Sequence, residues 1–149
     1  MTLHHLLLIL HLLAASIWVG GHLILSIRFL PRALKQNDPD IISNFEKQYE
    51  PIGMPALLLL IVTGIWMAYD FGLKVNHWFS FLSGIGMVIS IKLILLLLTF
   101  AFAIHARFFV IPKLSKHNLK EMAVHIVAVT VIGVAMLILG STIRYGGIH

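Results

Sequence analysis

The sequence contains no cysteine. This absence excludes disulfide bonds, thiolate metal sites, iron–sulfur clusters and covalently attached c-type haem. Charge is also scarce, since 11% of the residues are charged whereas 59% are hydrophobic. A soluble domain of 149 residues cannot bury that much apolar surface. The composition therefore predicts a protein whose solvent is lipid.

The sequence contains four long apolar stretches. Backbone groups in lipid must be satisfied internally, and these runs are continuous rather than alternating, so we expect helices that cross about 30 Å of hydrocarbon. The sequence shows no convincing internal repeat. It predicts an all-α fold in which residues 1–149 form one domain, a four-helix transmembrane bundle with spans at residues 3–29, 54–68, 79–107 and 121–143.

The net charge of +5 is explained by where the basic residues lie. Eight of the eleven Lys and Arg residues fall in two segments on the same side of a four-span arrangement, residues 28–50 and 107–120. The positive-inside rule makes that side cytoplasmic and places both termini outside. We therefore expect a multi-pass protein of a bacterial-type inner membrane, with the bilayer and not nucleic acid as its partner; a homo-oligomer is left open.

Histidines form a stripe along the first expected span. Successive helical residues turn by about 100°, so steps of seven and eleven return close to the same face. His4, His11, Trp18, His22 and Phe29 therefore share one face, and the opposite face is Leu and Ile. A polar stripe of this kind is expected to point into the bundle rather than toward lipid.

The inward-facing side chains fall at two depths. His22 and His125 each lie five or six residues from a basic residue at the expected cytoplasmic edge, and His105 lies at the same level. Eleven residues further toward the outside, about 16 Å away, the first and last spans carry His11 and Met136. The sequence thus predicts an inner and an outer level of polar or sulfur-bearing side chains inside the bundle.

Imidazoles from different helices at one depth are suited to hold a metal ion or haem iron. We expect His22 and His125 to be the axial ligands of a haem b, with His105 as a substitute. A second haem at the outer level would use His11 with Met136. Each single histidine is also open to a plainer interpretation, as a hydrogen-bond partner between helices.

Lys92 lies near the middle of "SIKLILLLL", where a charged ammonium is costly without a partner. The residue could pair with a cofactor carboxylate, shuttle a proton or reach a backbone carbonyl. We expect it to have a catalytic role.

Three segments carry a resemblance to a known family: "HLLAASIWVGG", the Thr-Gly of "LLIVTGIWMA", and "IKLILLLLTFAFAIHARFFVIPKL". They resemble the CopD (copper-resistance D-like) integral membrane family and, more distantly, the HemJ-type protoporphyrinogen oxidases. The first relationship implies copper handling, and the second implies a haem-b membrane oxidoreductase. The residues that match the motifs are His11, Trp18, Gly20, Gly21, Lys92, Arg107 and Pro112; of these, we expect His11, Trp18 and Arg107 to contact a cofactor.

Three functions stay open at this point. The first is a b-type haem protein with one or two haems that transfers electrons or acts as an oxidoreductase, with membrane quinol or a redox protein as partner. The second is a copper transport or copper-resistance protein, although the methionines, which are the soft ligands that Cu(I) prefers, are scattered along the chain. The third is a structural subunit whose histidines only connect helices.

Overall fold

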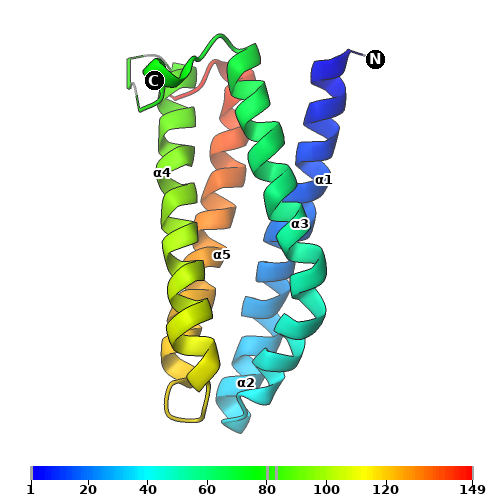
Figure 1. The fold of residues 1–149 in the computed structure, drawn as a ribbon, viewed down its shortest axis with the longest axis vertical. Coiled ribbons are helices and arrows are strands. Elements are labelled where there is room, and N and C mark those ends of the chain that lie inside the picture. Colours follow the sequence, from blue (N-terminus) through cyan, green and yellow to red (C-terminus); the bar gives the residue numbers. More distant parts are fainter. Residues whose placement is uncertain (1, 80, 83, 149) are drawn as a thin grey trace.

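The computed structural model describes residues 2–79, 81–82 and 84–148, and throughout these residues the regular structure is helical. Four long helices run side by side (Figure 1). Two of them change geometry near one end, passing from α-helix through a short π-helix. The elements are α1 (Leu3–Ile24), η1 (Leu25–Phe29), α2 (Leu30–Gln36), α3 (Asp40–Asp70), η2 (Val75–His77), α4 (Gly84–His105), η3 (Ala106–Val110), η4 (Ile111–Lys113), α5 (Leu119–Thr142) and η5 (Ile143–Tyr145).

The four long helices are each long and apolar enough to cross a membrane, which confirms the predicted all-α four-helix bundle. The chain is a multi-pass membrane protein. Both ends of the chain lie at the same end of the bundle (Figure 1), and we call this the terminal end. The opposite end carries the two basic segments, residues 28–50 and 107–120, and we call it the basic end.

α1 begins at Leu3, as expected, whereas α3 and α4 begin at residues other than the predicted ones. α3 begins at Asp40 rather than near residue 54, and it contains Pro51 and Pro55 in its interior. The earlier start follows from packing, because Ile42 is fully buried in the core at the basic end. α4 begins at Gly84 rather than at residue 79. Phe79 has a φ of 64°, a left-handed conformation that an α-helix cannot contain.

The element order shows a repeat that the sequence analysis did not find. α1 and α4 each have 22 residues, each continues into a π-helix of five residues, and each π-helix is followed after one residue by a proline, Pro31 or Pro112. Each of these helices is then paired with the helix that returns to the terminal end, α3 or α5 (Figure 1). The bundle therefore consists of two helical hairpins with the same plan, joined mainly where α1 contacts α5.

Two apolar clusters hold the hairpins together. One lies at the basic end and the other near the middle of the bundle, where Trp18, Val19, Leu57 and Val129 are buried together. Leucine and isoleucine side chains elsewhere on the long helices are exposed, as expected for surfaces that face lipid. Neither cluster extends to the terminal end of the bundle, and a cavity lies between the helices in that half.

Candidate functional site

A cavity of about 720 Å³ lies between the four long helices. It extends from Trp18 and Leu57, near the middle of the bundle, to His4, Phe71 and Arg144 at the terminal end. Most of its lining is aliphatic or aromatic. The side chains in the lining that carry nitrogen, oxygen or sulfur are His4, His11, Trp18, Met67, Trp78, Lys92, Met136, Ser141 and Arg144.

A hydrogen bond fixes the imidazole of His11. Nδ1 of His11 lies 2.8 Å from the hydroxyl oxygen of Thr63, and that hydroxyl lies 2.6 Å from the carbonyl oxygen of Leu59. A carbonyl only accepts, so the Thr63 hydroxyl donates to Leu59 and accepts the Nδ1–H of His11. The neutral ring then carries its lone pair on Nε2, which is the atom left to bind a ligand.

Lys92 enters the same cavity from the other hairpin. It is the ninth residue of α4, just as His11 is the ninth residue of α1. Each of the two side chains reaches a glycine on the returning helix of its own hairpin. A Cβ atom at Gly64 would lie 3.3 Å from Cε1 of His11, and one at Gly140 would lie 3.4 Å from Nζ of Lys92. The two basic side chains thus occupy equivalent places in the two hairpins.

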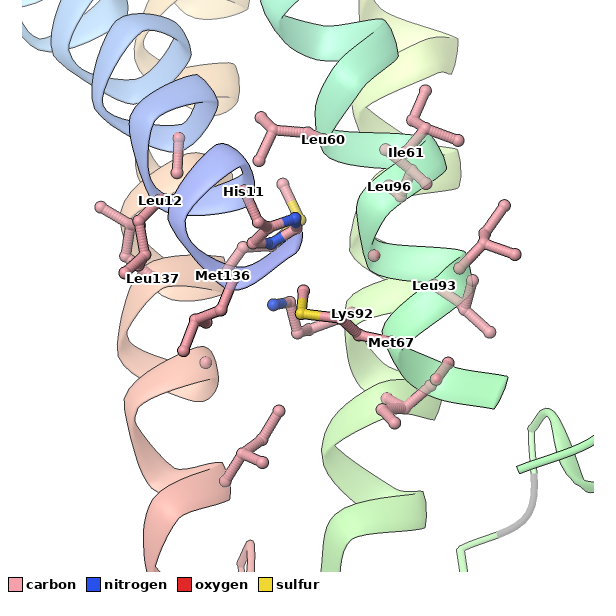
Figure 2. Close-up of a pocket in the computed structure, with 18 of the residues that line it drawn as sticks. His11, Leu12, Leu60, Ile61, Met67, Lys92, Leu93, Leu96, Met136 and Leu137 are labelled. Carbon is pink, nitrogen blue, oxygen red and sulfur yellow. The ribbon is translucent and has the colours of Figure 1, made fainter. Parts of the chain in front are cut away.

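Two methionines line the cavity beside these groups. Met67 lies one helical turn after Thr63 on α3, and Met136 lies one turn before Gly140 on α5. Figure 2 shows both thioethers with the imidazole of His11 and the amine of Lys92 in one region of the cavity. Met136 was expected from the sequence but Met67 was not, although the spacing of Met67 from the Thr-Gly motif is a helical signal that could have identified it.

His22 lies outside the lining of this cavity. Its Nδ1–H donates to the carbonyl oxygen of Trp18 at 2.9 Å, and its ring packs against the rings of Trp18 and Tyr49 with centroids 4.4 and 5.6 Å away. The Tyr49 hydroxyl donates to the same carbonyl at 2.9 Å. His22 thus belongs to an aromatic group between α1 and α3, whereas Trp18 belongs to both this group and the cavity wall.

His105 and His125 form a pair at the basic end. Nδ1 of His105 lies 2.8 Å from Nε2 of His125, and Nδ1 of His125 lies 2.8 Å from the carbonyl oxygen of Glu121. Since that carbonyl accepts from Nδ1–H of His125, Nε2 of His125 accepts from His105. His125 therefore contacts His105, whereas His22 contacts Trp18 and Tyr49. The pairing of His22 with His125 as the ligands of a haem stays a prediction.

Arg107 is also at the basic end, where it pairs with Glu50 at 3.1 Å with both side chains largely exposed. It does not line the cavity. Of the residues expected to contact a metal or cofactor, the structure brings His11, Trp18 and Met136 to one cavity, together with Lys92. It places the histidine pair and Arg107 elsewhere.

Carboxylates do not contribute to the cavity. None of the six Asp and Glu residues lines it, and in the part of the chain that the structure describes no three His, Cys, Asp or Glu side chains come together as a metal site. The donors that lie together beside Lys92 are the imidazole nitrogen of His11 and the thioether sulfurs of Met67 and Met136. Such a set is soft and poor in negative charge, which suits monovalent copper better than a hard divalent cation.

Comparison with known proteins supplies the family. No curated protein and no solved structure is significantly similar to the chain, so the resemblance to HemJ-type proteins stays a prediction. The family model that matches is CopD, copper resistance protein D, over residues 43–143. This range begins within α3 and runs through α5, about two thirds of the chain, and it does not include α1 with His11. The chain belongs to the copper resistance protein D family.

Proposed function

We propose that the protein binds Cu(I) as its cargo inside the membrane and thereby handles copper. The observation that carries this proposal is the cavity that joins one imidazole and two thioethers in a chain of the copper resistance protein D family. Cu(I) is a soft ion for which thioether and imidazole are favourable ligands. The scattered positions of the methionines in the sequence argued against copper, and the fold removes this objection because it brings Met67 and Met136 to the same cavity.

Each group in the cavity has a part in this proposal. His11 binds the ion through Nε2, because Thr63 occupies its Nδ1–H and holds the ring in place. Met67 and Met136 supply sulfur from α3 and α5. Gly64 lets α3 approach the imidazole closely. Trp18 forms the inner wall, so the ion is held in a site that excludes water on that side.

A second candidate function is binding of haem b in the same cavity, with electron transfer to or from a quinol or a redox partner. The observation that favours it is the size and apolar lining of the cavity, about 720 Å³. His11 and Met136 are the lining residues that would hold the haem iron. Lys92 and Arg144 would meet the propionates. The haem would supply the redox chemistry, and the protein would tune it through these ligands.

The orientation is part of the proposal. With the basic end in the cytoplasm, as the distribution of Lys and Arg predicts, the terminal end and the mouth of the cavity face the outside of a bacterial-type inner membrane. Copper would then enter from the outside at the level of His4 and Arg144, which line the cavity there. The histidine pair and Arg107 lie at the cytoplasmic end.

The test is a titration of the purified protein in detergent with Cu(I), in competition with a chromogenic Cu(I) chelator. We expect one copper per chain, which is lost in His11→Ala and in the double variant Met67→Leu, Met136→Leu. Met54→Leu is the matched control, because Met54 is exposed and outside the cavity. Retention of copper by the double variant would contradict the proposal, and a Soret band with stoichiometric haem would favour the second candidate.

A further inference from the structure

The amine of Lys92 has no partner among the residues that the structure describes. It points into the cavity from α4 (Figure 2), and within the described residues it makes neither a hydrogen bond nor an ion pair. The carboxylate nearest to the cavity along α3 is Asp70, which lies 3.2 Å from Nδ1 of His4 at the terminal end. The Asp and Glu side chains of the described residues therefore supply no paired negative charge to Lys92.

An isolated ammonium at this depth is costly. Lys92 lies eight residues beyond the first residue of α4, about 12 Å along the helix, and the walls around it are largely apolar. A charged side chain in such a place is normally paired. A copper ion in the cavity does not relieve this cost, because it adds a second positive charge. A molecule that enters the cavity with its own negative charge would compensate this ammonium.

The cavity also has room for such a molecule. Its volume of about 720 Å³ is far larger than one metal ion and its ligands require, and the lining beyond His11 consists mostly of leucine, isoleucine and aromatic side chains. An apolar body is favoured there because it replaces water along these walls. Arg144 lies at the mouth, and its positive charge favours the approach of an anion.

We propose that the cavity binds a long-chain carboxylic acid, with its carboxylate on the ammonium of Lys92 and its hydrocarbon chain along the apolar walls. One ammonium matches one singly charged carboxylate. A phospholipid has the same combination of anion and hydrocarbon, but its headgroup is larger and more strongly hydrated, and it would have to descend about 12 Å from the end of the helix to reach Lys92. The carboxylic acid is therefore the occupant that fits both the charge and the depth.

The experiment compares a fluorescent polyunsaturated fatty acid, cis-parinaric acid, with its methyl ester, using delipidated protein in a neutral detergent. Both probes have the same apolar body, but only the acid carries a charge. We expect the wild type to bind the acid at least tenfold more tightly than the ester. Lys92→Met should abolish this preference and leave the affinity for the ester unchanged, whereas Lys92→Arg should keep the preference. Lys74→Met, at an exposed lysine outside the cavity, should behave as the wild type does.

Equal affinity for acid and ester in the wild type, or a preference that survives in Lys92→Met, would overturn the proposal. Displacement of the probe by phosphatidylglycerol at lower concentrations than by oleic acid would also overturn it, because a phospholipid would then be the occupant. The outcome is independent of copper. A preference for the acid in a protein that binds no copper would refute the proposed function alone, and copper binding without the preference would refute this inference alone.

Discussion

Replacing Gly21 by Ala should destabilise the bundle, whereas the same replacement at the adjacent Gly20 should not. The ring of Tyr49 lies between Gly21 of α1 and Gly53 of α3. A Cβ atom at Gly21 would overlap Cε2 and Cζ of that ring and would lie 2.7 Å from its hydroxyl oxygen. A Cβ atom at Gly20 would have no atom within 4 Å.

The expected loss in the free energy of unfolding follows from the contacts that the Tyr49 ring would lose if a methyl group at Gly21 displaced it. Forcing an extra methyl group into a packed interface costs about 1–3 kcal/mol. Displacing Tyr49 also weakens the hydrogen bond from its hydroxyl to the carbonyl of Trp18, which is worth about 0.5–1.5 kcal/mol. The gain in helix propensity from Gly to Ala returns up to about 1 kcal/mol. The net loss at Gly21 is therefore about 2 kcal/mol, and Gly20→Ala should be neutral or stabilising by up to about 1 kcal/mol.

The assay is thermal unfolding of the two variants in detergent, followed by the monodisperse fraction that remains in solution. For a chain of this size a loss of about 2 kcal/mol corresponds to a fall in Tm of about 4–8 °C. Equal Tm values for Gly21→Ala and Gly20→Ala would refute the reasoning, because the two changes have the same chemistry and differ only in the presence of Tyr49.

The remaining predictions concern the support of His11 and the topology. Thr63→Val removes the acceptor of the His11 Nδ1–H and should weaken Cu(I) binding about 10–100-fold, as loss of a hydrogen bond behind a metal ligand commonly does. Thr99→Val is its matched control, because Thr99 is equally buried but donates only to its own helix; an equal loss in both variants would contradict the role of Thr63. Reporter fusions after Gln36 and Asn118 should both report a cytoplasmic location, and a periplasmic signal from either would overturn the proposed orientation.

The fold class was predictable because lipid imposes a strong constraint on sequence. Long uncharged runs in a chain without cysteine can only be helices that satisfy their own backbone groups. The start of α3 was not predictable in the same way. Residues 40–53 are too polar to be part of a hydrophobic window, and they are helical because Ile42 and Tyr49 pack against neighbouring helices. The repeat of the two hairpins is also hidden, because it is expressed mainly in helix lengths and π-helices, and isolated matches such as Pro31 with Pro112 are too few to reveal it.

The candidate site was partly predictable. The helical period placed His11 and Trp18 on an inward face, and matching of depths placed Met136 at the level of His11; all three line the cavity. The same matching of depths gave no information on which helices are neighbours. For this reason it associated His22 with His125, whereas His125 contacts His105 in the structure. Met67 was missed because its one signal is its helical spacing from the Thr-Gly motif, and the same spacing fits a methionine that is used only for packing.

The proposed copper site consists of a single Cu(I) ion bound by an imidazole and two thioethers in the intramembrane cavity. X-ray absorption spectroscopy of the Cu(I)-loaded protein tests it most directly, because nitrogen and sulfur neighbours of copper scatter differently. We expect a first shell with one imidazole nitrogen from His11 and two sulfurs, and loss of the sulfur contribution in the variant Met67→Leu, Met136→Leu. A first shell of nitrogen or oxygen alone in the wild type, or sulfur that persists in the double variant, would contradict it.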